Sequence, residues 1–138
     1  MPYTITQTHQ YLHVAEQQYA IAKKVRFTTL DSCIGVAGRR NNGRVVGVHL
    51  VVVGAQGPFD EAAANVVADL VQDCDEVMIV GAYTIWQDSV GAAFDVLTER
   101  LNPTLVYADG VPSLQFRVSH GRLRYKLNAS RWCSCLGV

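Results

Sequence analysis

The chain lacks an excess of charge of either sign. Its 138 residues contain twelve lysines and arginines and twelve aspartates and glutamates, so the formal net charge is zero at pH 7. Attraction to nucleic acid or to an anionic membrane surface needs a surplus of basic residues. The composition therefore argues against both, and we expect no nucleic-acid partner.

Long hydrophobic runs are also missing. The longest, residues 45–55, is interrupted by His49 and is shorter than the roughly 18 residues that cross a bilayer. Residues 1–7 have neither the basic region nor the apolar run of a secretory signal. We expect no membrane insertion, and residues 45–55 are better interpreted as a buried strand.

No cysteine framework is present. The four cysteines lack the paired C-x-x-C spacing of zinc knuckles and the spacing of a disulfide scaffold; they are Cys33, Cys74, Cys133 and Cys135. With 49% hydrophobic residues the chain is long enough to bury a core without disulfides, so reduced thiols are the default expectation. We expect no cofactor and no metal. The alternative is a zinc protein in which Cys133 and Cys135 join Cys33 and His49 as ligands.

The length predicts one domain, residues 1–138, with a loose N-terminal arm at 1–19 and a C-terminal tail at 129–138. Between the arm and the tail, the alternation of apolar and polar residues and the turn residues predict a central hairpin. They also predict five further strands, at 20–30, 76–81, 104–107, 114–119 and 122–128. Two helices are predicted, one at 61–72 capped by Asp60 and one capped by Asp88 that runs to residue 101. This order indicates an α/β (α+β) two-layer sandwich, with two principal helices on a mostly antiparallel or mixed sheet.

The best candidates for catalytic residues are Cys33 and His49, which flank a glycine-containing turn in a strand–turn–strand segment. A five-residue loop over 39–43 would place Cys33 directly opposite His49 on one face of the hairpin. A tight turn at Asn42-Gly43 would send the two side chains to opposite faces. A functional interpretation therefore requires the longer loop or a bulge.

A cysteine beside a histidine is an activated nucleophile, because the imidazole stabilises the thiolate and later protonates a leaving amine. The simpler interpretation is a small core cysteine and a hydrogen-bonded interior histidine. Spacing alone favours this simpler interpretation.

The segment Thr28-Thr29-Leu30-Asp31-Ser32-Cys33 and the histidine on the next strand resemble the chemoreceptor glutamine deamidase family, CheD. That family carries Leu-Gly-Ser-Cys preceded by threonine, and deamidase toxins of the cytotoxic necrotizing factor type carry a similar motif on a similar fold. The resemblance covers residues 25–127, and Asp31 stands where the family has glycine. It implies that Cys33 is the nucleophile, His49 the general acid/base, and Thr28, or alternatively Thr29, the residue that orients the histidine.

By this resemblance the chain is expected to convert a glutamine side chain of a protein substrate to glutamate with release of ammonia. The Cys33 thiolate would attack the carboxamide at a shallow, exposed site, and the backbone N–H of Cys33 with the Ser32 hydroxyl or a loop N–H would form the oxyanion hole. Gln56 is a further candidate for positioning the amide.

The expected partner is a protein that presents an exposed glutamine, in the bacterial cytoplasm or, after export without a signal peptide, in a target cell. The role is that of a bacterial effector or of a divergent chemotaxis-type enzyme. A catalytically inactive binding module of the same fold is the alternative from a different class.

Overall fold

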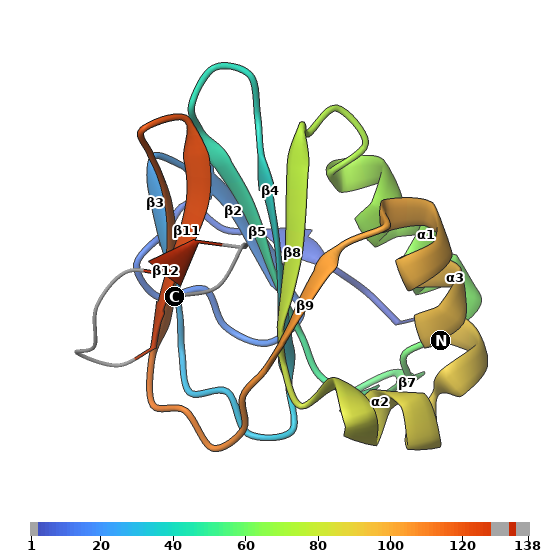
Figure 1. Cartoon of the computed structure of the whole chain (residues 1–138). Coiled ribbons are helices and arrows are strands. Elements are labelled where there is room, and N and C mark those ends of the chain that lie inside the picture. The colour runs from blue at the N-terminus through green and yellow to red at the C-terminus, as the bar shows by residue number, and fades with distance from the viewer. Residues whose placement is uncertain (1–2, 128–132, 135–138) are drawn as a thin grey trace.

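The fold has three layers, a four-stranded sheet, a six-stranded sheet and a layer of helices (Figure 1). The computed structural model describes residues 3–127 and 133–134. The predicted α+β sandwich is confirmed. The described residues form two large sheets where one was predicted, so the sandwich has three layers instead of two and the six-stranded sheet is covered on both faces.

The six-stranded sheet lies in the middle, and its order is β1 (Thr6–Gln7), β2 (Gln18–Ala22), β5 (Val45–Leu50), β4 (Ile34–Arg39), β8 (Glu76–Gly81) and β9 (Thr104–Tyr107). The two outer pairs, β1 with β2 and β8 with β9, are parallel, and the inner pairs are antiparallel. The predicted strands at 76–81 and 104–107 are thus confirmed.

The four-stranded sheet is antiparallel throughout and has the order β12 (Cys133–Ser134), β11 (Arg122–Leu127), β10 (Leu114–Ser119) and β3 (Lys24–Phe27). The predicted hairpin of 114–119 and 122–128 is confirmed over its described residues. The single strand predicted at 20–30 is wrong, because the chain leaves β2 at Lys23 and enters β3 of the other sheet. A short two-stranded ribbon of β6 (Val53–Gly54) and β7 (Gly57–Pro58) completes the strands.

The helices cover one face of the central sheet. Helix α1 (Glu61–Leu70) begins as predicted, with the Asp60 carboxylate accepting a hydrogen bond from the N–H of Ala63 at 2.8 Å. The second predicted helix is wrong in its start, since the chain forms α2 (Tyr83–Ser89) and then α3 (Gly91–Leu101), and Asp88 lies inside α2 instead of capping. No helix in the described part of the chain has the length and apolar character to cross a membrane.

Two hydrophobic cores result from the three layers. Alternate residues of β4 and β5, such as Val36 and Val48, pack against the helices, whereas Ala37, Val45 and the nearby Cys33 belong to the core between the two sheets. Every residue of β5 is buried because both of its faces are covered. This explains why the strand is an almost continuous apolar run in the sequence.

The β4–β5 hairpin has a different register from the one predicted. Its loop does contain five residues, but it spans 40–44, and Gly35 lies opposite His49. Cys33 is displaced by two residues from that pair. Because side chains alternate with a period of two, the displacement keeps Cys33 on the same face as His49 and makes them diagonal neighbours.

The N-terminal segment is packed, unlike the loose arm expected from its composition. The Tyr3 hydroxyl donates a hydrogen bond to the carbonyl of Val51 at 2.7 Å, and the side chain of Val14 is fully buried. Val14 also forms an isolated parallel bridge with Phe27. The segment thereby reaches the core between the sheets.

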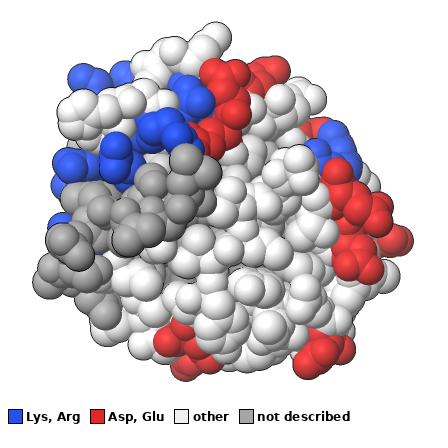
Figure 2. Space-filling model, viewed as in Figure 1, with Lys and Arg blue, Asp and Glu red and all other residues white. Residues whose placement is uncertain are grey.

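Charged side chains are distributed unevenly over the layers. Figure 2 shows lysines and arginines gathered on the side of the four-stranded sheet and many of the acidic side chains on the side of the helices. Glu76 joins the two sheets, because its carboxylate contacts Arg39 of β4 at 3.1 Å and Arg122 of β11 at 3.0 Å. Arg122 is therefore held in an ion pair within the fold.

Gly81, where β8 ends, allows a close approach to the residue that precedes β4. Its φ is +150°, and a Cβ there would lie 2.3 Å from the carbonyl oxygen of Cys33. We expect Gly81→Ala to lower the free energy of unfolding by about 2 kcal/mol or more, measured by urea denaturation. Gly91→Ala is the matched control, since nothing lies within 4 Å of a Cβ at Gly91. Equal losses in the two variants would contradict this explanation.

Candidate functional site

Cys33 is positioned by an unusual backbone turn at Ser32. Ser32 has a φ of +59°, its N–H donates to the Asp109 carboxylate at 2.8 Å, and its carbonyl accepts a hydrogen bond from the Trp86 indole at 3.0 Å. The family resemblance places a glycine one residue earlier, at Asp31. The left-handed conformation therefore falls on Ser32, where two hydrogen bonds from distant elements hold it.

His49 lies on the face of β5 that packs against the four-stranded sheet. Its ring contacts the ring of Phe27, with centroids 5.3 Å apart. Gly35 opposite it and Gly47 two residues earlier make room for Phe27, because a Cβ on either glycine would overlap that ring or crowd it. The glycines of the hairpin thus allow an aromatic ring to cover the sheet beside the histidine.

The backbone carbonyl of Val14 fixes the protonation of the His49 ring. It lies 2.9 Å from Nδ1 of His49. A carbonyl oxygen only accepts hydrogen bonds, so Nδ1 carries the proton and Nε2 of the neutral ring carries a lone pair. Nε2 is buried and has no hydrogen-bond partner among the described residues. The structure therefore presents an unused basic nitrogen inside the protein.

Thr28, the residue expected to orient the histidine, acts through its backbone. Its N–H donates to the same carbonyl of Val14 at 3.1 Å. The group that orients His49 is thus the Val14 carbonyl, with Thr28 holding that carbonyl in place. Thr29 is exposed, and the hydrogen bond of Nδ1 goes to Val14.

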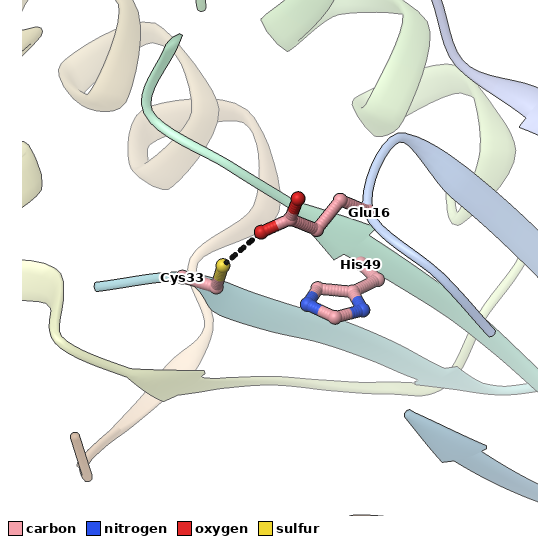
Figure 3. A group of neighbouring side chains, drawn as sticks. All are labelled: Glu16, Cys33 and His49. Carbon is pink, nitrogen blue, oxygen red and sulfur yellow. Dashed lines mark hydrogen bonds between the residues drawn. The ribbon is translucent and has the colours of Figure 1, made fainter. Parts of the chain in front are cut away.

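Glu16 is the third member of the cluster. The thiol of Cys33 donates a hydrogen bond to Oε2 of Glu16 over 3.3 Å, as Figure 3 shows, and the carbonyl of Asp31 is a second acceptor at 3.4 Å. Sγ of Cys33, a carboxylate oxygen of Glu16 and a ring nitrogen of His49 all lie within 4.8 Å of one another. A thiol, a carboxylate and an imidazole therefore meet at one point of the fold.

Burial keeps both partners neutral. Desolvation by burial, aided by the hydrogen bond from the thiol to Glu16, raises the pKa of Cys33 to about 12. Desolvation also lowers the pKa of His49 below its ordinary value of 6.5, against the opposing effects of the Val14 carbonyl and Glu16. The resting pair is a thiol and a neutral imidazole, rather than a thiolate and an imidazolium.

The expectation of a shallow, exposed cysteine is wrong. The exposed fraction is 1% for Cys33 and 0% for His49. Glu16, which is exposed, lies directly against the sulfur. Glu16 is therefore the solvent-exposed member of the cluster, and Cys33 and His49 are its buried members.

The other predicted residues lie around this centre. Ser32 has its N–H occupied by Asp109, which leaves its hydroxyl for the expected donor role. The Gln56 side-chain carbonyl accepts from Gln17 at 3.4 Å and from Thr4 at 3.3 Å, so it contacts the residue after Glu16 and not Cys33.

The alternative zinc ligands of the tail stay untested. Cys133 lies in β12 and pairs with Tyr125, but its side chain is outside the described residues. Cys135 is also outside them.

Sequence reasoning missed Val14 and Glu16. Val14 contributes a main-chain atom, which no residue type signals. Glu16 belongs to a polar segment whose composition is typical of a surface arm, and it meets Cys33 only through the tertiary fold. The one signal that could have placed Glu16 near His49 is the pairing of β2 with β5, because Gln18, two residues after Glu16, lies opposite His49.

The raised pKa of Cys33 predicts a distinct alkylation profile. Because the thiolate is the reactive form, the rate at Cys33 should be low at pH 7 and rise about tenfold per pH unit up to pH 10. Glu16→Gln removes a charge that raises this pKa, so it should accelerate alkylation roughly tenfold at pH 8. Iodoacetamide labelling resolved by peptide mass spectrometry measures both effects.

Cys74 serves as the internal control, because it lies in another part of the fold and its rate should not respond to Glu16→Gln. A Cys33 rate that is already high and flat below pH 8 would show a preformed thiolate–imidazolium pair. That result would contradict the neutral resting state.

Comparison with known proteins supplies no further assignment. The chain matches no protein-family model, and a search of curated proteins finds no significant relative.

Proposed function

We propose that the protein is a cysteine-dependent protein-glutamine deamidase that releases ammonia from a glutamine side chain of a protein substrate. The observation that carries the proposal is the unpartnered Nε2 of His49, held as a lone-pair nitrogen by the Val14 carbonyl and close to the Cys33 thiol. A base that is already deprotonated suits the activation of a thiol with a high pKa.

In the first half of the reaction, Nε2 of His49 takes the thiol proton as Sγ of Cys33 attacks the carboxamide carbon. A carbon–sulfur bond forms, and the carbonyl oxygen becomes an oxyanion. His49 then gives its proton to the amide nitrogen, the carbon–nitrogen bond breaks, and ammonia leaves a thioester on Cys33.

In the second half, water replaces ammonia. His49 accepts a proton from the water as its oxygen attacks the thioester carbon. The carbon–sulfur bond breaks, Cys33 recovers its proton, and the product is glutamate. The net change consumes one water and one glutamine amide and restores both residues.

Three groups near Cys33 have roles in this scheme. Glu16 occupies the polar side of the thiol, so its carboxylate moves aside when the substrate carboxamide arrives. The backbone N–H of Cys33 and the Ser32 hydroxyl are the donors that we assign to the oxyanion. The backbone turn at Ser32 fixes where the N–H of Cys33 points.

The full burial of Cys33 and His49 also favours a second candidate, a binding module of the same fold without catalytic activity. In that case the pair is a hydrophobic core contact and Glu16 is a surface residue that satisfies the thiol. The two candidates differ in one measurable property, the release of ammonia.

Deamidation should depend on Cys33 and not on Cys74. The purified protein is incubated with a bacterial lysate that contains chemoreceptors and with an animal-cell lysate, and glutamine-to-glutamate conversions are mapped by mass spectrometry. We expect conversions with the unaltered protein and with Cys74→Ser, and a loss of at least about 100-fold with Cys33→Ser. Circular dichroism confirms that each variant is folded.

A modified protein in the bacterial lysate would indicate a role in the producing cell. A modified protein in the animal-cell lysate would indicate a role as an effector. A primary amine added to the reaction distinguishes transglutamination, because the product then carries the amine instead of a carboxylate. Unchanged conversion by Cys33→Ser, or no conversion in either lysate, would contradict the proposal and favour the binding module.

A further inference from the structure

The side chains of Glu16, Cys33 and His49 form a cluster in which the proposed reaction gives Glu16 no chemical role. Catalysis as described employs the thiol and the imidazole, but it assigns the carboxylate only the task of moving aside. All three offer atoms that bind metal ions, and the three atoms lie within 4.8 Å of one another. Figure 3 shows them turned toward a common point from β5, the start of β4 and the loop before β2.

The His49 ring is arranged as metal-binding histidines commonly are. Its Nδ1–H donates to the Val14 carbonyl at 2.9 Å, and its Nε2 is buried and has no partner in the described part of the chain. A ligating histidine usually gives its other ring N–H to a carbonyl or carboxylate, which fixes the ring and points the lone pair at the metal. An unsatisfied buried nitrogen also costs free energy, which a bound cation would recover.

The distances are close to those of a zinc site. Zinc binds sulfur at about 2.3 Å and nitrogen or oxygen at about 2.0–2.2 Å, so two ligands of a tetrahedral ion lie about 3.5 Å apart. The sulfur of Cys33 and the carboxylate oxygen of Glu16 are 3.3 Å apart. The remaining pairs lie within 4.8 Å, so they need to close by up to about 1.3 Å, and Glu16 is an exposed side chain that is able to move.

The charges also balance. One thiolate, one carboxylate and a neutral imidazole bring two negative charges to a doubly positive ion, so the occupied site is neutral. A neutral cluster is far less costly to bury between two sheets than an isolated charge. Thiolate and imidazole ligands favour zinc, whereas magnesium and calcium favour oxygen ligands.

We propose that the protein binds one Zn²⁺ through Glu16, Cys33 and His49, and that the bound ion masks the Cys33 thiol. Three protein ligands leave a fourth position, which lies on the side of exposed Glu16 and is filled by water. The binding itself does not depend on the proposed deamidase activity. Where that activity exists, zinc would inhibit it, because the nucleophile and the base would both be coordinated.

Cobalt substitution tests the site, since Co²⁺ reports its ligands by absorption. One equivalent should give a thiolate-to-cobalt charge-transfer band in the 138-residue chain. We expect Cys33→Ser to abolish this band and Cys74→Ser, the matched control, to retain it. Replacing Cys133 and Cys135 together by serine should leave the band unchanged, and its loss there would assign the metal to the tail instead.

Zinc affinity supplies a measurement that does not require changing a buried residue. Glu16→Gln keeps the size of an exposed side chain, so it should fold while lowering the zinc affinity at least about tenfold in a chelator-competition titration. One equivalent of Zn²⁺ should also protect Cys33 from iodoacetamide, and a chelator should restore its reactivity.

Unaltered affinity in Glu16→Gln, a cobalt band that survives Cys33→Ser, or no protection of Cys33 by zinc would each overturn the proposal. Ammonia release that zinc stimulates would overturn the masking role. A metal-binding protein without ammonia release would leave the zinc site standing and refute the deamidase, so the two proposals fail separately.

Discussion

The hydrogen bond between the Val14 carbonyl and Nδ1 of His49 is the interaction on which both proposed uses of the site depend. It selects the tautomer in which Nε2 is a base, and it aims that base at the sulfur of Cys33. The same carbonyl accepts the N–H of Thr28, the residue that follows β3, so the N-terminal segment links the histidine of one sheet to the end of a strand in the other. A main-chain atom thereby does the work that a third side chain was expected to do.

Burial gives the site its second defining property. It raises the pKa of the thiol and lowers that of the imidazole, and both shifts favour the uncharged pair. In the two proposals, the pair stays uncharged until a substrate displaces Glu16 or a metal ion binds to Glu16, Cys33 and His49 together. The two uses that we propose for the cluster, proton transfer from thiol to imidazole and coordination of zinc, exclude one another at any moment.

The sequence predicted those elements that local patterns specify. The cap at Asp60, the strand at 76–81 and the last hairpin follow from residue types and periodicity, and each is found. The strand boundary at Lys23 and the second sheet depend on long-range pairing, and the diagonal register of Cys33 and His49 depends on where the five-residue loop begins, which residue types do not specify. Cys33 and His49 could be identified from the sequence because they belong to the same hairpin segment. Val14 and Glu16 were not, because a carbonyl has no sequence signature and Glu16 meets the cysteine only through the packing of the N-terminal segment.

The protonation of His49 is the most direct test of the account. Nitrogen-15 NMR of the imidazole side chains, with the His49 signals assigned by their loss in His49→Gln, distinguishes the two neutral tautomers and the charged ring. The account predicts a neutral ring at pH 7 with the proton on Nδ1 and a free lone pair on Nε2. A proton on Nε2, or on both nitrogens at that pH, would contradict it, because in neither form does Nε2 carry the lone pair that accepts the thiol proton or binds a metal ion.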